Sequence, residues 1–257
     1  MIVSTFNVNS VRARAERVAG FLAARRPDVL CLQETKVEDA LFPHELFGPL
    51  GWHVRAYGQK TWNGVAIAVR DGLEEKDVHC GLAGTEEEAG RRLIALTVGD
   101  LRIINVYVVN GQEVGSAKFE MKLRFLAALR DFLADEISRH EKLIIVGDFN
   151  IAPADLDVHD PAHWDGKVLC SAEERAALTA MKALGLGDLF RVMHPEAREF
   201  SWWDYRMLGF PKNLGLRIDL ILATAAAAKA AQRCWIDRDE RKGKNASDHA
   251  PVLAEFG

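Results

Sequence analysis

The chain has few cysteines, and none of them lies close to another. It contains 257 residues and four cysteines, without a Cys-x-x-Cys pair: Cys31, Cys80, Cys170 and Cys234. Zinc sites and thiol redox centres usually require closely spaced cysteines, and disulfide frameworks are typical of shorter, cysteine-rich chains. The spacing therefore argues against these classes of protein. Cys31 lies in an apolar run, so we expect it to be a buried free thiol.

Long hydrophobic runs and a surplus of positive charge are also missing. No apolar segment approaches the roughly 20 residues that cross a bilayer, and Met1–Asn7 reads as a strand without the basic start of a signal peptide. We therefore expect a cytoplasmic protein with no membrane partner. The net charge of −4 excludes a uniformly basic protein, so any contact with nucleic acid must come from a local cluster of cations.

The chain does contain a regular alternation of short apolar runs and helical patterns. We expect strands at Ile2–Phe6, Val29–Leu32, Val65–Val69, Leu93–Val98, Leu101–Val108, Leu143–Val146, Ile218–Ala223 and Val252–Phe256. We expect helices at Val11–Leu22, Ala117–His140, Ala172–Leu184 and Ala225–Ala231. No long Pro/Gly/Ser linker divides the chain, which predicts a single domain over residues 1–257, with mixed sheets and outer helices.

Polar side chains cluster at the ends of several predicted strands. They comprise four acids, two amides and one imidazole: Glu34, Asp148, Asp219, Asp248, Asn7, Asn150 and His249. Oxygen ligands without a Cys/His cluster suit Mg²⁺ or Mn²⁺ better than zinc. A cation, a free carboxylate and an imidazole paired with an acid meet the needs of phosphodiester hydrolysis. If these strand ends share one rim, the sequence predicts such a site there.

Each of these elements also has an ordinary structural interpretation. A glutamate after a strand is often solvated, Gly147–Asn150 could form a β-turn, and Asp248 could be a cap. Asp219 is harder to explain in this way, because a carboxylate within Leu216–Leu222 is costly to bury without a partner. The prediction depends on the ordered set and on no single residue.

The ordered set resembles the exonuclease III family of abasic-site endonucleases, within the endonuclease/exonuclease/phosphatase superfamily. The matching segments cover nearly the whole chain: Phe6–Arg14, Leu32–Lys36, Asn63–Ala66, Asn105–Tyr107, Gly147–Asn150, Phe200–Arg206, Gly215–Leu220 and Ser247–Val252. The resemblance implies a four-layer α/β sandwich, in which two mixed β-sheets pack face to face between helices. It also implies an active site at one edge, with Glu34 as the principal ligand of Mg²⁺ (Mn²⁺ is the alternative). Asn7 would lie close by, and Asp248 in or near the metal shell.

The catalytic roles that the resemblance implies fall on five residues. Asp148 would orient or deprotonate the attacking water, and Asn150 would hold that water or a phosphate oxygen. His249, paired with Asp219, would contact the scissile phosphate. Tyr107 would donate its hydroxyl to the same phosphate.

The resemblance further implies contacts with the substrate. Trp202, Leu216 and Ile218 would line a pocket for a sugar without a base. Lys36 and Arg206 are the best candidates for contacts with DNA phosphates, because they adjoin the catalytic segments.

The implied activity is Mg²⁺-dependent hydrolysis 5′ to abasic sites, with 3′-repair phosphodiesterase and 3′→5′ exonuclease activity. The partner would be double-stranded DNA with abasic sites or 3′ ends, and the enzyme a monomer. A relative that cleaves another phosphoester, such as an inositol-phosphate phosphatase, a sphingomyelinase or a non-specific nuclease, is the alternative. Ser201–Arg206 and Gly215–Asp219 favour the abasic-DNA branch. A non-catalytic DNA-binding protein is disfavoured, because no catalytic position of the motif is missing.

Overall fold

Short apolar runs form two mixed β-sheets of six strands each. The structure is a computed structural model that describes residues 1–257. The first sheet has the spatial order β13 (Ala231–Ile236), β14 (Val252–Phe256), β1 (Ile2–Asn7), β2 (Val29–Gln33), β4 (Val65–Arg70) and β3 (Trp52–Tyr57). The second has the order β5 (Glu75–Cys80), β6 (Leu93–Val98), β7 (Leu101–Tyr107), β8 (Leu143–Asp148), β12 (Asp219–Thr224) and β9 (Leu186–Asp188). Only β1 with β2 and β7 with β8 are parallel neighbours.

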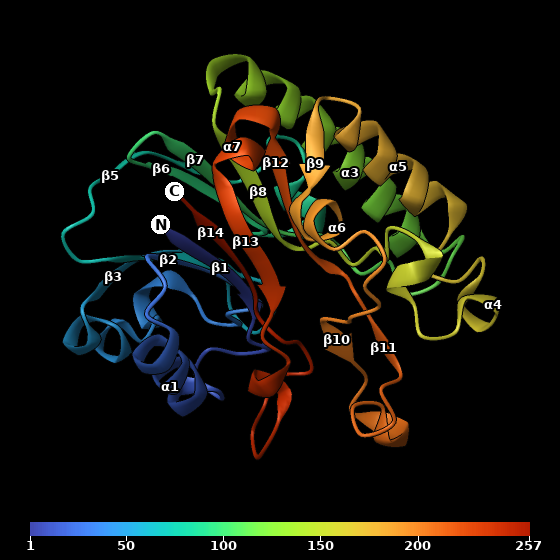
Figure 1. The fold of residues 1–257 in the computed structure, drawn as a ribbon, viewed down its shortest axis with the longest axis horizontal. Coiled ribbons are helices and arrows are strands. Elements are labelled where there is room, and N and C mark those ends of the chain that lie inside the picture. Colours follow the sequence, from blue (N-terminus) through green and yellow to red (C-terminus); the bar gives the residue numbers. More distant parts are fainter.

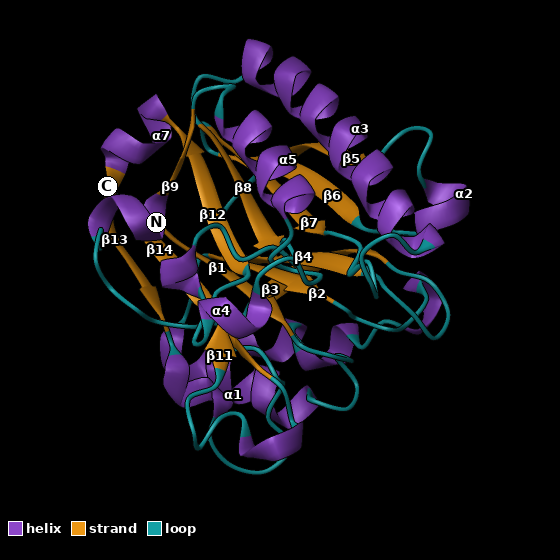
Figure 2. Ribbon diagram, turned by 90° about the vertical axis from the view of Figure 1, so that its right-hand side faces the viewer, coloured by secondary structure: helices purple, strands orange, loops and turns teal.

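Helices cover the outer faces of both sheets. The helix α1 (Ala15–Arg25) lies on the first sheet, and α3 (Ala117–Arg139) and α5 (Ala172–Lys182) lie side by side over the second (Figures 1 and 2). The shorter helices are α2 (Glu86–Ala89), α4 (Pro161–Trp164), α6 (Leu189–Met193) and α7 (Ala225–Ala230). A small hairpin of β10 (Trp202–Trp203) and β11 (Gly215–Leu216) extends from the end of the sandwich where β12 begins (Figure 1).

The core follows from the alternation of side chains along each strand. In β8, Ile144 and Val146 point into the cluster between the two sheets, whereas Leu143 and Ile145 point into the cluster beneath α3 and α5. A third cluster lies between the first sheet and α1. The four-layer sandwich with two mixed sheets is therefore confirmed.

The expected strands and helices are all present, with small differences at their ends. The first helix begins at Ala15 and not at Val11. The backbone N–H groups of Ser10 and Val11 instead donate to the carbonyls of Glu34 and Thr35, which ties this turn to the segment after β2. Cys31 is buried as expected, and all four thiols are free. None of the helices has the length and apolarity required to span a membrane.

The strand topology brings the ends of the inner strands of both sheets together. Asn7 pairs with Gln33 at the ends of the parallel strands β1 and β2. In the second sheet, Asp148 is the register partner of both Tyr107 and Asp219. Because β1 packs against β8 across the core, the polar residues that follow these strands meet at one rim.

Candidate active site

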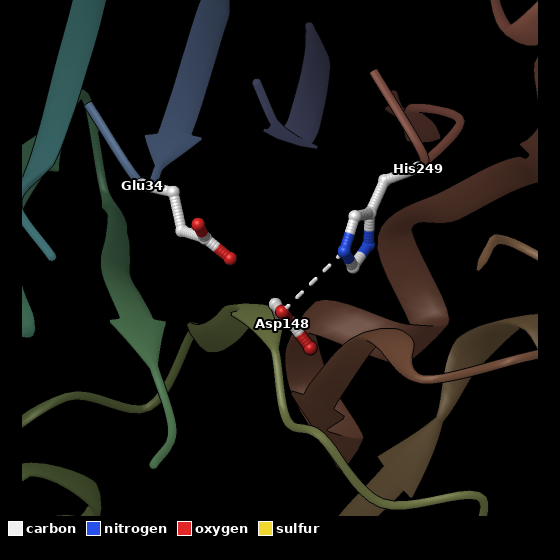
Figure 3. Close-up of side chains that lie close together, drawn as sticks. All are labelled: Glu34, Asp148 and His249. Carbon is white, nitrogen blue, oxygen red and sulfur yellow. Dashed lines mark ion pairs between the residues drawn. The ribbon is translucent and has the colours of Figure 1, made fainter. Parts of the chain in front are cut away.

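Three side chains at this rim converge on one point. Glu34, Asp148 and His249 face one another (Figure 3), and one potential ligand atom from each lies within 4.8 Å of the others. The amide of Asn7 connects the two acids, because its Nδ2 donates to Glu34 Oε1 and to Asp148 Oδ2, each over 2.9 Å. Residues of both sheets therefore contribute to one cluster, as expected if the strand ends converge at one rim.

Gly147 allows β8 to lie close to β7 directly before Asp148. Its φ of +145° is unfavourable for other residues, and a Cβ at this position would lie 1.9 Å from the carbonyl oxygen of Val106 on β7. A side chain here would therefore push β8 away from β7 directly before Asp148.

Asp148 is buried and densely hydrogen-bonded. One carboxylate oxygen accepts from the backbone N–H of Asn150 over 2.9 Å, and the other accepts from the side chains of Asn7 and Asn150. Burial raises the pKa of Asp148 to about 7. The positive charge of His249 opposes this rise, and the negative charges of Asp219 and Glu34 add to it. A carboxylate with a pKa near neutrality can exchange a proton with water at physiological pH.

His249 forms a buried pair with Asp219. Its Nδ1 lies 2.9 and 3.1 Å from the two carboxylate oxygens of Asp219. Burial alone would lower the pKa of His249, but the carboxylates of Asp219 and Asp148 raise it to about 10. The imidazole is therefore positively charged. Its Nε2 faces Asp148 Oδ2 at 3.8 Å (Figure 3), and this nitrogen is the one left to donate to a substrate.

The donor set at Glu34 fits a hard divalent cation. Burial alone would raise the pKa of Glu34, but the charge of Lys36 and hydrogen bonds from Asn7 and Lys36 lower it, so the carboxylate is ionised. Carboxylate oxygens are ligands that Mg²⁺ and Mn²⁺ prefer, and no cysteine lies among these residues. Asn7 presents its Nδ2 to Glu34, whereas its Oδ1 accepts from the backbone N–H of Asn9. Glu34 and Asp148 are the two acids of the converging group.

Asp248 lies at the side of this cluster. It is not one of the three converging residues; its carboxylate accepts from Asn9 Nδ2 and from the indole N–H of Trp202, each over 3.0 Å. Burial alone would raise the pKa of Asp248, but His249 and these two hydrogen bonds lower it. Asn9 Oδ1 in turn accepts from Lys36 over 2.7 Å, so Asp248 is linked to Glu34 through Asn9 and Lys36.

Tyr107 and Asn150 border the cluster on the side of the second sheet. Burial, and next the negative charge of Glu34, raise the pKa of Tyr107 well above its ordinary value, so its hydroxyl keeps its proton. The guanidinium of Arg92 lies 4.5 Å from the centre of the Tyr107 ring. The Asn150 side chain donates to Asp148 and to the carbonyl of Val108, and accepts from Asn110 Nδ2 over 2.9 Å.

The residues expected to bind substrate differ in their exposure. Trp202 is half-buried beside a cavity of about 450 Å³, which Trp164, Arg206 and Met207 also line. Leu216 and Ile218 are 0 and 1% exposed, and they belong to a small core cluster against which Trp202 packs. Of the three residues expected to line a pocket, only Trp202 therefore has an exposed surface.

The two expected cationic contacts also differ. Lys36 lies 2.8 Å from Glu34 Oε2 and lines a second cavity of about 400 Å³, together with Glu34 and Tyr107. Arg206 is exposed in the loop of the β10–β11 hairpin and pairs with Asp204 over 2.7 Å. Of the converging residues, Glu34 thus lines the cavity beside Tyr107, and Trp202 lines the other cavity.

Sequence reasoning missed several residues that organise the site. Asn9 lies in the first matching segment, but the sequence does not indicate its contact with Asp248. The sequence also does not indicate that the Ser201 hydroxyl accepts from the backbone N–H of Asp219 over 3.0 Å. Lys122 and Glu174 form a buried ion pair behind Asn150. A signal for Lys122 existed, because a lysine on the apolar stripe of α3 needs a buried partner.

Comparisons with known proteins agree with this geometry. Residues 4–249 match the endonuclease/exonuclease/phosphatase family. Exodeoxyribonuclease III of Haemophilus influenzae is 38% identical over 264 residues, and the alignment covers 98% of each chain. The solved 3′ phosphatase NExo from Neisseria, bound to a product DNA hairpin, is 45% identical with a TM-score of 0.96, and covers 100% of this chain and 99% of its own. An AP endonuclease from Archaeoglobus fulgidus is 37% identical with a TM-score of 0.93, again with 100 and 99% coverage.

Proposed function

The chain belongs to the endonuclease/exonuclease/phosphatase family and is a DNA repair nuclease of the exonuclease III type, and we propose that it uses Mg²⁺ to hydrolyse the phosphodiester 5′ to abasic sites. The observation that carries the proposal is the convergence of the half-buried Glu34 with the buried Asp148 and His249 at the rim of the two sheets. We further propose that the chain acts as a monomer and as a single domain.

We assign the metal to Glu34, with Asn7 beside it and Asp248 at the edge of the same site. A bound Mg²⁺ ion supplies positive charge for the non-bridging oxygens of the scissile phosphate. Lys36 already pairs with Glu34, so it keeps that carboxylate ionised and ready to act as a ligand.

The remaining chemistry is assigned to the protein side chains. Asp148 takes a proton from water while Asn150 holds that water, and the water oxygen bonds to phosphorus. The charged His249, oriented by Asp219, donates from Nε2 to a phosphate oxygen, and Tyr107 donates its hydroxyl to the same group. The bond between phosphorus and the 3′ oxygen breaks, the leaving oxygen takes up a proton from solvent, and Asp148 releases its proton to solvent. The products are a 3′ hydroxyl and a 5′ phosphate on the abasic sugar.

The metal assignment predicts that Glu34→Gln will require far more Mg²⁺ than the wild type, because the variant loses the charge of the principal ligand. Excess chelator should abolish turnover, and Mg²⁺ should restore it. The measurement is kcat against metal concentration, and Glu38→Gln is the matched control at a nearby exposed position. Full turnover of the wild type in excess chelator would exclude a metal at Glu34.

The pocket assignment predicts that Trp202→Ala will lose discrimination between abasic and intact duplex by ~1–3 kcal/mol, the usual value of one aromatic contact with a nucleotide. A sugar without its base is compact and costs less to extrude than a paired nucleotide, and Trp202 presents an apolar wall backed by Leu216 and Ile218. The measurement is the ratio of kcat/KM on the two duplexes.

A melting curve and Trp202→Phe control for this prediction. The phenylalanine keeps an aromatic wall but loses the indole N–H that Asp248 accepts. An unchanged kcat/KM ratio in Trp202→Ala, together with a lower melting temperature, would make Trp202 a packing residue and locate the pocket elsewhere.

A second candidate activity is the removal of blocking groups from 3′ ends, with trimming of the 3′ strand. It is favoured by the 45% identical Neisseria structure, which is described as a 3′ phosphatase bound to product DNA. The same activated water and charged histidine serve a terminal phosphate.

The experiment that tests both candidates compares kcat/KM on four substrates. These are an abasic duplex, a recessed 3′ end, a duplex with a 3′ phosphate, and a soluble phosphomonoester. We expect the highest kcat/KM on the abasic duplex, followed by the two substrates with 3′ ends. A preference for the 3′ phosphate would favour the second candidate, and a preference for the soluble ester would contradict both.

A further inference from the structure

Lys122, in the second turn of α3, is a lysine with no exposed surface. Its ammonium group has three N–H donors and three acceptors: the carboxylate of Glu174 on α5, the carbonyl of Asn110 at 3.1 Å and the carbonyl of Asn150 at 2.7 Å. Burying such a charge is costly, and an apolar pair of similar volume often stabilises a fold as well or better. The pair therefore calls for an explanation other than stability alone.

The two carbonyls that Lys122 binds belong to the segments that follow β7 and β8. Asn150 donates its backbone N–H to Asp148 Oδ1 over 2.9 Å, and its side chain donates to Asp148 Oδ2. Asn110 donates to Asn150 Oδ1 over 2.9 Å. A hydrogen-bonded path thus runs from Lys122 through Asn150 to both oxygens of the catalytic carboxylate.

These segments pack directly on the lysine stem. A Cβ at Gly111 would lie 3.1 Å from Lys122 Cδ and 3.1 Å from Val168 Cγ2. The chain after β7 therefore lies in contact with Lys122, and a side chain at Gly111 would press on both Lys122 and Val168.

Glu174 is itself held in place. Its carboxylate accepts from the backbone N–H groups of Leu169 and Ser171, each over 3.0 Å, and from Ser171 Oγ over 2.8 Å, in the capping box that begins α5. The Glu174 carboxylate is therefore held in one position. It can in turn fix the Lys122 ammonium and the two carbonyl groups that this ammonium binds.

We propose that the Lys122–Glu174 pair is a positioning device that fixes the backbone at Asn150 and thereby directs the Asp148 carboxylate toward the attacking water. The inference rests on the role proposed above for Asp148. Lys122 and Glu174 are positioning residues, since neither is among the residues that line the cavities beside the converging cluster.

The same helix offers a matched control. Arg102 and Glu136 form another buried ion pair, 3 and 2% exposed, with Arg102 Nε 2.5 Å from Glu136 Oε2. Arg102 lies near the start of β7 and Tyr107 at its end, so five residues, or roughly 16 Å of strand, separate this pair from the site.

The test compares Lys122→Met with Arg102→Met. Both variants should lower the free energy of unfolding, because Lys122→Met leaves the buried Glu174 without a cation and Arg102→Met leaves the buried Glu136 with only the exposed Arg139 at 2.6 Å. Only Lys122→Met should lower kcat, by about 10- to 100-fold, with KM changed by less than about threefold, because misplaced catalytic groups cost rate more than binding. Only Lys122→Met should also speed hydrogen exchange at the backbone N–H of Asn150, measured by NMR.

The double variant Lys122→Met/Glu174→Gln removes both buried charges and keeps the test decisive if Lys122→Met does not fold. It should regain stability but retain the low kcat and the fast exchange at Asn150. Recovery of kcat together with stability would overturn the proposal, as would equal losses of kcat in Lys122→Met and Arg102→Met. The exchange measurement needs no substrate, so unchanged exchange at Asn150 refutes positioning even if the wild type fails to cleave abasic DNA, which would refute the proposed function instead.

Discussion

Asp148→Asn is expected to lower kcat by at least about 10²- to 10⁴-fold, the range associated with losing a general base. The substitution keeps the shape of the side chain and removes its charge and basicity. The residue replaced is a buried carboxylate whose pKa is raised by burial to about 7, so the proton-accepting group itself is lost. Binding of DNA should persist or tighten, because a negative charge next to the phosphate is gone.

The measurement is single-turnover cleavage of abasic duplex together with a binding isotherm. Asp155→Asn is the matched control, because Asp155 lies in the segment after β8 and is exposed. Its kcat should equal that of the wild type. A near-normal kcat with weakened binding in Asp148→Asn would reverse the assignment and make Asp148 a binding residue.

Substitution of either member of the His249–Asp219 pair is expected to be nearly as severe. His249→Gln removes the charged donor, and Asp219→Asn removes the carboxylate that orients the ring and raises the pKa of His249. Each single variant should lose at least about 10²-fold in kcat. The double variant should lose little more than the worse single variant, because both changes disable one unit.

A double-mutant cycle on kcat tests this coupling. The exposed pair of His53 and Asp71, with 3.4 Å between His53 Nδ1 and Asp71 Oδ1, provides a control cycle in which neither substitution should change kcat. If the losses at His249 and Asp219 multiply fully, the two residues do not act as a unit.

Most of the sheet structure is predictable from the sequence, and the exceptions have a common physical cause. The inner strands are apolar on both faces, so β2 and β8 are visible as aliphatic runs. The strands β3, β5, β9 and β13 were not expected, and each lies at an edge of its sheet. The two-residue strands β10 and β11 of the hairpin were not expected either, since they are too short to show a strand pattern. In β5, Glu75–Cys80 is largely exposed and carries charged side chains, so it lacks the apolar pattern by which a strand is predicted.

The site is predictable wherever its residues follow a strand. Asn7, Glu34 and Asp148 could be found because a polar residue after an apolar run is visible in the sequence, and parallel neighbours end at the same rim. Packing in three dimensions is not visible in this way. The sequence shows that Leu216 and Ile218 are apolar, but not that they lie beneath Trp202.

Hydrogen bonds between residues far apart in the sequence also cannot be predicted from it. Lys122 and Glu174 are 52 positions apart and lie on different helices. No local pattern relates them, and only the packing of α3 against α5 brings them together.

The most direct test of the central claim is where the attacking oxygen ends up. Cleavage of an abasic duplex in water enriched in the heavy oxygen isotope should yield a 3′ hydroxyl on one fragment. The other fragment should carry a 5′ phosphate with one heavy oxygen, because a water prepared by Asp148 attacks phosphorus. An unsaturated sugar at the 3′ end, with no heavy oxygen in the phosphate, would indicate elimination at the sugar and would contradict hydrolysis by Glu34, Asp148 and His249.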